Sequence, residues 1–186
     1  MNYILASASP RRRELLALAG LRFEVRVADV DETIPPGQDA AEAACSLARQ
    51  KAEAVAADCP DSCVIAADTV VVLDNIILGK PADEADAARM LRLLSGREHR
   101  VVTGVCIALG NRRRVFSRET RVRFYALRDC EIEQYVATGE PMDKAGAYGI
   151  QGRGGLLAKS IAGDYFNVVG LPIASLVREL EEFTRE

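Results

Sequence analysis

The chain has 186 residues, with 24 Lys and Arg against 27 Asp and Glu, and one His. This length fits one large domain or two small lobes that share a core, and 49% hydrophobic with 27% charged residues is an ordinary globular composition. A net charge of −3 gives no diffuse basic field for nucleic acid, and one His excludes multi-His metal sites. The chemistry must therefore come from carboxylates, Lys, Arg and hydroxyls.

The first half of the chain alternates strand and helix patterns. An apolar run at 3–6 predicts a strand, and 11–19 a helix with Ser9 as N-cap and Pro10 in its first turn. Alternation predicts a strand at 23–27, before an acidic loop, a Pro-Pro-Gly break at 35–37 and a helix. The acidic loop spans residues 29–32, and the helix after the break is predicted at 40–57.

The second half contains hairpins as well as helices, so a mixed sheet flanked by helices is expected instead of a purely parallel one. The predicted elements are strands at 63–72 and 76–78, a helix at 83–94, strands at 100–109 and 115–125, a helix at 129–137, a glycine-rich loop at 144–155, one or two strands within 156–169, and a last helix opened by Pro172.

The five cysteines are scattered and include no C-x-x-C pair, which argues against a disulfide framework and a zinc knuckle. The N-terminus lacks the charge order and length of a secretory signal, and no stretch approaches the length of a membrane span. We therefore expect a cytoplasmic protein without membrane or nucleic-acid partners.

Three arginines open the first predicted helix, where the helix dipole disfavours each cation by roughly 0.3–1 kcal/mol. Arg11, Arg12 and Arg13 make sense there if an anion, most naturally phosphate, occupies the helix N-terminus. The hydroxyls of Ser7 and Ser9 would join the arginines in binding it. The alternative is a solvated arginine cluster.

Two lysines, Lys51 and Lys80, are candidates for a second phosphate contact. Lys51 shares a helical stripe with Leu47 and Val55, where a core-facing residue is expected. It either points into a cleft or is a lysine whose stem lies along the edge of the core. Lys80 lies between Gly79 and a proline, after a predicted hairpin, on a stiff backbone.

One carboxylate interrupts an otherwise buried strand. Asp68 lies among alanines and valines, where an isolated charge is very costly, so it must be hydrogen-bonded, paired or metal-bound. It could bind Mg²⁺ or act as a general base on water, and the alternative is a structural Asp bonded to backbone amides. Glu32, in the acidic loop, could be a second metal carboxylate or simply a solvated side chain.

Cations for a polyphosphate and carboxylates for a divalent metal together indicate phosphoryl chemistry, which depends mainly on positioning and charge neutralisation. The chain has no Walker A motif and no G-x-G-x-x-G after a strand, which disfavours the P-loop and Rossmann classes.

Several motifs together resemble the Maf family of septum-formation-inhibitor-like nucleoside triphosphate pyrophosphatases, over nearly the whole chain. They are LASASPRR at 5–12, ADT at 67–69, GKP at 79–81, SG at 95–96 followed by His99 and TG at 103–104, DKAGAYGIQG at 143–152, Gly163 and VGLP at 169–172. The resemblance implies a single domain over 1–186 with an ITPase-like Maf fold: two α/β lobes around a long curved mixed sheet, with a central nucleotide cleft and, as is often the case in the family, a homodimer.

The resemblance also implies a divalent-metal-dependent hydrolase, with Mg²⁺ or Mn²⁺, that cleaves nucleoside triphosphates to the monophosphate and pyrophosphate. Asp68 would be the catalytic base and would share the metal with Glu32. The phosphate contacts would fall on residues already singled out above: Ser7, Ser9, Arg11, Arg12, Lys51 and Lys80.

The branch that this chain resembles prefers dTTP, UTP and related or modified pyrimidine nucleotides. The Gln151 amide offers a donor and an acceptor, which suits the O4 and N3–H edge of uracil or thymine. Arg12, Thr69 and Gln151 are therefore the expected specificity residues. His99 belongs to a family motif too, and we interpret it as a structural hydrogen-bonding group.

Two alternatives remain open at this point. One is a nucleotide-binding regulator of septum formation whose activity is incidental, and the presence of both Asp68 and Glu32 disfavours a pure binder. The other is a 7-methyl-GTP pyrophosphatase. The physiological role implied by the resemblance is to keep non-standard nucleotides out of nucleic acids, with a link to cell-division arrest.

Overall fold

The computed structural model describes residues 1–27, 29–35 and 37–185. These residues divide into two compact units: unit 1 is Met1–Thr69, Thr103–Arg118 and Gly170–Glu186, and unit 2 is Val70–Val102 and Glu119–Val169. Pro36, part of the break predicted at 35–37, lies outside the described residues.

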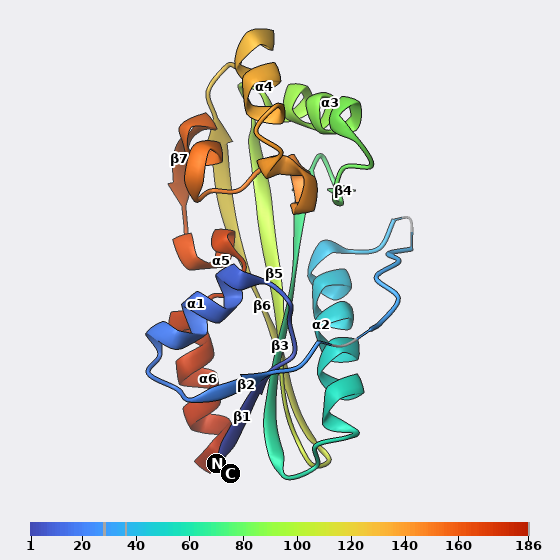
Figure 1. The fold of residues 1–186 in the computed structure, drawn as a ribbon, viewed down its shortest axis with the longest axis vertical. Coiled ribbons are helices and arrows are strands. Elements are labelled where there is room, and N and C mark those ends of the chain that lie inside the picture. Colours follow the sequence, from blue (N-terminus) through green and yellow to red (C-terminus); the bar gives the residue numbers. More distant parts are fainter. Residues whose placement is uncertain (28, 36, 186) are drawn as a thin grey trace. The chain divides into compact units, whose positions relative to one another are not determined.

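The strands found in the described part of the chain form one seven-stranded mixed sheet in the order β2-β1-β3-β5-β6-β7, with β4 on β3 (Figure 1). In unit 1, β1 (Asn2–Leu5) lies parallel to β2 (Phe23–Val25) and to β3 (Ser62–Leu73). The register of β1 with β3 pairs Leu5 with Ile65, so the chain leaves β1 beside the middle of the long buried strand.

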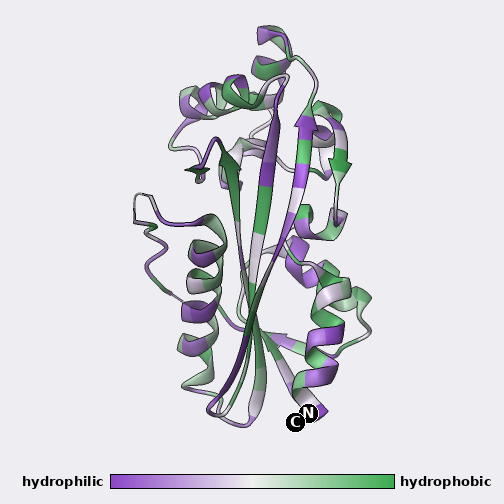
Figure 2. Ribbon diagram, turned by 180° about the vertical axis from the view of Figure 1, so that it is seen from behind, coloured by the Kyte–Doolittle hydropathy of each residue, from purple (hydrophilic) through white to green (hydrophobic). Residues whose placement is uncertain are grey.

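The helices of unit 1 are α1 (Pro10–Leu18), α2 (Ala40–Ala56) and α6 (Ile173–Arg185), and α2 lies on the opposite side of the strands from α1 and α6 (Figure 1). Hydrophilic and hydrophobic residues alternate along α2 and α6, as amphipathic helices on a sheet require (Figure 2). The apolar stripe of α2 is rich in alanine: it packs Ala48, Ala52, Val55 and Ala56 on Ala6, just after β1, and on the strand residues Ile4, Val64, Ala66, Cys106 and Ala108.

Small residues let α2 approach the sheet very closely at Gly104 on β5 (Glu98–Leu109). A Cβ added to Gly104 would lie 2.3 Å from the carbonyl carbon of Ala44, a separation that no side chain tolerates. Glycine at this position therefore sets the distance between α2 and β5, and so determines how closely side chains of α2 approach the strands.

Unit 2 is built on the remaining lengths of β3, β5 and β6 (Arg112–Phe124), because the unit boundary falls within each of these strands. Its core joins Val71, Leu91, Leu94, Phe124 and Tyr148, among other buried residues. The other elements of unit 2 are β4 (Ile76–Leu78), α3 (Glu84–Leu94), α4 (Asp129–Val136), the 3₁₀ turns η1 (Glu140–Asp143), η2 (Ala145–Ala147) and η3 (Gly152–Leu157), β7 (Ala158–Ala162) and α5 (Tyr165–Val169).

The structure confirms the mixed α/β class and most predicted elements, and it corrects two local interpretations. Residues 165–169 form the short helix α5 instead of a strand, because the Asp164 carboxylate accepts the Phe166 N–H at 2.8 Å and so starts a turn. The glycine-rich loop is also more ordered than predicted and contains η2 and much of η3. Among the described residues, no helix is long and apolar enough to cross a membrane.

The three arginines at the start of β6, Arg112–Arg114, fasten this strand to helices of unit 1. The Arg112 guanidinium stacks on the Phe183 ring at 4.5 Å, and Arg114 pairs with Glu179 at 3.2 Å and Glu182 at 3.3 Å. Arg113 Nε lies 3.6 Å from Glu53 of α2, so cation–π and ion-pair contacts with two helices account for this run.

Candidate active site

Two carboxylates and one ammonium meet in unit 1. Lys51 Nζ lies 2.6 Å from Asp68 Oδ1 and 2.7 Å from Glu32 Oε1. The Lys51 and Asp68 side chains are only 10% and 12% exposed, whereas Glu32 is 46% exposed. A nearly buried Asp–Lys pair therefore opens to solvent on the side where Glu32 lies.

Strand alternation and helical spacing explain why these groups meet. Val64 and Ala66 of β3 face α2, and Asp68 comes next in the same alternation. Lys51 continues the buried stripe of α2. The position of Lys51 that looked anomalous in the sequence thus supplies the cation that a buried strand Asp needs.

The turn between β1 and α1 places Ser7 and Ser9 at the N-terminus of α1. Ser9 caps α1 by accepting the Arg12 N–H at 3.4 Å, and Ser7 Oγ accepts the Ser9 N–H at 3.2 Å. Pro10 occupies the first turn, as predicted, and that turn holds no acidic side chain. The N-terminal N–H groups and dipole of α1 are therefore not neutralised by a carboxylate of their own turn.

The half-buried Arg12 side chain is oriented by three acceptors. Its Nε donates to Gly170 O at 2.8 Å, its Nη2 to Thr69 Oγ1 at 3.0 Å and its Nη1 to Ser7 Oγ at 3.4 Å. Thr69 Oγ1 is in turn 2.9 Å from the fully buried Thr103 hydroxyl. A guanidinium has five N–H groups, so Arg12 is held in place and still keeps donors for a ligand.

Electrostatics connect the α1 turn with the carboxylate pair. Burial lowers the pKa of the Arg12 guanidinium from its ordinary value, and the charge of Arg11 acts in the same direction. Asp68 and Glu32 oppose this shift through their negative charges. Arg12 therefore lies within the field of both carboxylates.

Unit 1 thus brings together seven of the sequence-predicted residues around Arg12 and Lys51: Ser7, Ser9, Arg12, Glu32, Lys51, Asp68 and Thr69. Arg11 is half-buried in the first turn of α1, next to Arg12. The other two predicted residues, Lys80 and Gln151, belong to unit 2.

The donor set fits a divalent cation that is shared with a substrate. In the described part of the chain, no group of three or more His, Cys, Asp or Glu residues could hold a metal by itself. Mg²⁺ is usually held by one or two carboxylates together with waters and substrate phosphates. Asp68 and Glu32, which converge on one ammonium, match that pattern better than an all-protein metal cage.

In unit 2, Lys80 is exposed in the bend after β4, beside Gly79, whose carbonyl accepts the Gly146 N–H at 3.0 Å. Gln151 is half-buried just before η3. His99 is buried, and its Nε2 lies 2.7 Å from the Tyr148 hydroxyl, which confirms its interpretation as a structural hydrogen-bonding group. Burial lowers the pKa of His99 to about 4.

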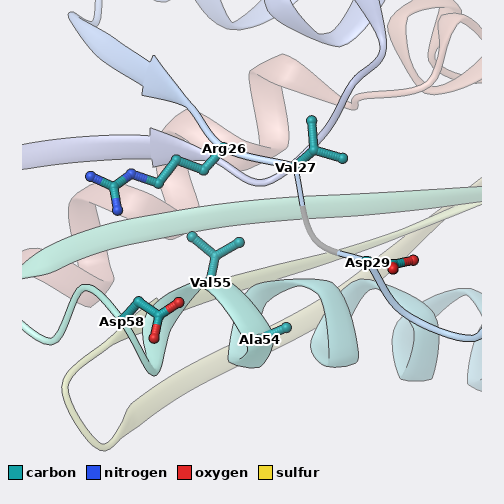
Figure 3. A pocket seen from close by; sticks show the side chains of 6 residues that line it. All are labelled: Arg26, Val27, Asp29, Ala54, Val55 and Asp58. Carbon is teal, nitrogen blue, oxygen red and sulfur yellow. The ribbon is translucent and has the colours of Figure 1, made fainter.

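A pocket of about 280 Å³ lies elsewhere in unit 1 (Figure 3). Arg26 in its wall approaches Cys59 Sγ at 3.0 Å and Glu24 at 3.6 Å. None of the sequence-predicted site residues lines this pocket, whose walls are Arg26, Val27, Asp29, Ala54, Val55 and Asp58. It is therefore separate from the Lys51 cluster.

Reasoning from the sequence missed two parts of the arrangement. Gly170 contributes through its backbone carbonyl, which no side-chain pattern reveals. Thr103 was noted only within a family motif, although a Thr inside an apolar strand signals a buried hydrogen bond.

Comparison with known proteins identifies the family to which the chain belongs. The profile of the family described as Maf-like protein matches residues 2–183. A protein of a Geobacillus species named dTTP/UTP pyrophosphatase is 56% identical over 178 residues, which are 96% of each chain. A protein of Bacillus cytotoxicus with the same name is 52% identical over 182 residues, which are 98% of this chain and 95% of that one.

Among solved structures, a HAM1 protein from Coxiella burnetii matches 98% of this chain and 99% of its own, with a TM-score of 0.55 and 16% identity. At that identity the likeness concerns the fold alone. The match of the family profile over almost the entire sequence and the high identity to full-length relatives show that the chain belongs to the Maf-like protein family.

Proposed function

We propose that this protein is a nucleoside triphosphate pyrophosphatase that hydrolyses dTTP and UTP to the monophosphate and pyrophosphate. The observation that carries the proposal is the joining of Asp68 and Glu32 by Lys51 within the field of Arg12. The two relatives named dTTP/UTP pyrophosphatase, at 56% and 52% identity, support this activity and substrate pair.

The triphosphate would be held by the α1 turn and the cations. Ser7 and Ser9 would donate hydroxyl hydrogen bonds, and the N–H groups at the start of α1 suit an anion. Arg11 and Arg12 would pair with phosphate oxygens, as would Lys51 and Lys80. These cations lower the free energy of a transition state in which negative charge moves onto the leaving pyrophosphate. The full set of proposed phosphate contacts is Ser7, Ser9, Arg11, Arg12, Lys51 and Lys80.

Asp68 would act as the general base. It would accept a proton from a water whose oxygen bonds to the α phosphorus, while the bond from the α phosphorus to the bridging oxygen breaks and pyrophosphate leaves. The 2.6 Å contact with Lys51 orients the Asp68 carboxylate and compensates its charge in a nearly buried position. Glu32 lies on the more exposed side of the cluster, where substrate would enter.

Glu32 and Asp68 are the residues that would hold a divalent cation, Mg²⁺ or Mn²⁺. When bound, such an ion supplies neutralisation of phosphate charge that the protein cations provide only in part. Lys51 Nζ, which pairs with both carboxylates, would lie beside this ion.

Recognition of the base is assigned to Gln151, with Arg12 and Thr69 placing the nucleotide. The Gln151 amide can accept from N3–H and donate to O4 of uracil or thymine, and it cannot satisfy both positions of cytosine with the same orientation. The Arg12–Thr69 contact at 3.0 Å fixes the guanidinium that would meet the nucleotide.

Three further features belong to the proposal: a homodimer, a cytoplasmic location and a role in removing non-standard pyrimidine nucleotides. Sedimentation of the purified protein would decide the first. Fractionation of the native cells would decide the second, and a panel of modified triphosphates the third.

The deciding experiment incubates the purified protein with dTTP, UTP, CTP and 7-methyl-GTP, with and without Mg²⁺ or Mn²⁺. The proposal expects dTMP or UMP with pyrophosphate, a preference for dTTP and UTP, and dependence on the added metal. Release of inorganic phosphate in place of pyrophosphate would refute the reaction. A preference for 7-methyl-GTP would refute the substrate assignment.

A further inference from the structure

A glutamate outside the proposed catalytic cluster fastens the loop that carries Gln151. Glu140 Oε1 accepts the Gly154 N–H at 3.1 Å, and Glu140 Oε2 accepts the Arg153 N–H at 3.2 Å. Both amides follow directly after Gln151 and Gly152 in the chain. One carboxylate therefore holds the C-terminal side of this loop through two charge-assisted hydrogen bonds.

A buried tyrosine of α4 fastens the other side of the same loop. The Tyr135 hydroxyl donates to Glu140 Oε1 at 3.0 Å and accepts the Gly149 N–H at 3.2 Å. It is 4% exposed, and burial raises its pKa above the ordinary value. Tyr135 and Glu140, which we call the clasp, thus connect Gly149 with Arg153 and Gly154.

The closure made by the clasp is tight. A Cβ added to Gly154 would lie 2.2 Å from Gly149 O and 2.6 Å from the Tyr135 hydroxyl, so only glycine fits. On the N-terminal side of the loop, the hydroxyl of the buried Tyr148 lies 2.7 Å from His99 Nε2. The backbone on both sides of Gln151 is therefore fastened at several points.

We propose that Tyr135 and Glu140 are positioning residues for base discrimination, because they fix the backbone from which the Gln151 amide reads the pyrimidine. This inference rests on the proposed function. Uracil presents an acceptor at O4 and a donor at N3, whereas cytosine presents a donor at N4 and an acceptor at N3. The Gln151 amide can select uracil only if its backbone is held where the amide meets the O4 and N3–H edge at hydrogen-bond distance, and the clasp supplies that fixed position.

The test uses Tyr135→Phe and Glu140→Gln, with matched controls Tyr125→Phe and Glu133→Gln at exposed positions. Phenylalanine leaves the Gly149 N–H without its acceptor. Glutamine places an NH₂ donor against one of the backbone N–H groups. We expect the ratio of kcat/KM for UTP over CTP to fall by about tenfold in both clasp variants, with KM for UTP raised and kcat nearly unchanged. The controls should keep the wild-type ratio.

A second measurement does not depend on activity. Hydrogen exchange of the amides of Gly149, Arg153 and Gly154 should accelerate by at least about tenfold in the clasp variants and not in the controls. Glu140→Gln changes a half-buried side chain and keeps its shape, so it tests the clasp even if Tyr135→Phe fails to fold.

The outcomes separate the two proposals. A wild-type protein that does not hydrolyse UTP or dTTP refutes the proposed function, whatever the exchange data show. A wild-type protein that selects UTP over CTP through Gln151, together with clasp variants that keep this ratio, refutes the clasp alone. Unchanged amide exchange in both clasp variants refutes it as well.

Discussion

The ion pair between Lys51 and Asp68 makes a quantitative prediction about stability. Lys51→Met removes the ammonium and keeps a side chain of similar length on the buried stripe of α2. Asp68, 12% exposed, would then lose its cationic partner, and removing one member of a buried pair costs about 3–5 kcal/mol. We expect Lys51→Met to lower the free energy of unfolding by about 3 kcal/mol, at the lower end because the site opens toward Glu32.

Three further variants extend this prediction: Glu32→Gln, Asp68→Asn, and the double variant of Lys51→Met with Asp68→Asn, which closes a thermodynamic cycle with its two single variants. Glu32→Gln should cost less than about 1 kcal/mol, since the Glu32 side chain is 46% exposed and solvent screens its pair. Adding Asp68→Asn to Lys51→Met should restore roughly 2 kcal/mol, because the double variant leaves no buried charge behind.

Urea unfolding followed by circular dichroism at neutral pH measures the free energy of unfolding of the wild type and of the four variants. A Lys51→Met protein no less stable than Glu32→Gln would contradict the account of the pair. A double variant whose loss equals the sum of the losses of Lys51→Met and Asp68→Asn would contradict it equally, since independent sites add and coupled ones do not.

Three other predictions concern catalysis, packing and pH. Asp68→Asn should lower kcat by about 10²–10⁴-fold while nucleotide affinity, measured by calorimetry, changes little, because the amide cannot accept the proton of water. Gly104→Ala should destabilise the protein by about 1–3 kcal/mol in urea unfolding, since its Cβ would lie 2.3 Å from the Ala44 carbonyl carbon. Gly79→Ala, where nothing lies within 4 Å, is the matched control. Because burial lowers the pKa of His99 from 6.5 to about 4, the unfolded chain binds more protons between these values, so His99 makes stability fall as pH drops from 6.5 to 4. That contribution amounts to about 3 kcal/mol and should be missing from the pH profile of His99→Gln.

Each of these expectations has an outcome that contradicts it. Full activity of Asp68→Asn would mean that another group takes the proton. Equal stability of Gly104→Ala and Gly79→Ala would mean that α2 can withdraw from β5 without loss of packing. Parallel pH profiles of the wild type and His99→Gln would mean that His99 titrates near its ordinary pKa in the folded protein.

Much of the fold could be predicted from the sequence, because its signals are local. Ser9 and Pro10 marked the start of α1, and the alternation of apolar residues marked the long strands. The prediction of a strand at 165–169 was wrong because the apolar residues of this segment suit a strand as well as a helix. Whether this segment forms a helix or a strand depends on the Asp164 cap, a single hydrogen bond that the hydrophobic periodicity does not reveal.

In the candidate site, too, local signals revealed the individual residues and did not reveal their contacts. Asp68, Lys51 and the arginines at the start of α1 were visible in the sequence because each breaks a local rule: a charge in a buried strand, a charge on a buried stripe and cations at a positive helix end. Such violations identify residues one at a time. They do not say which residues are partners.

The tertiary structure alone decided the partners. Lys51 and Asp68 are 17 residues apart, and Arg12 and Gly170 are 158 apart, yet each pair is in direct contact. Packing of α2 at Gly104 and the register of β1 with β3 set those distances. By itself the sequence determined which groups are chemically out of place, since propensity and burial are local properties. Only long-range packing determined that they lie together, because contact depends on the path of the whole chain.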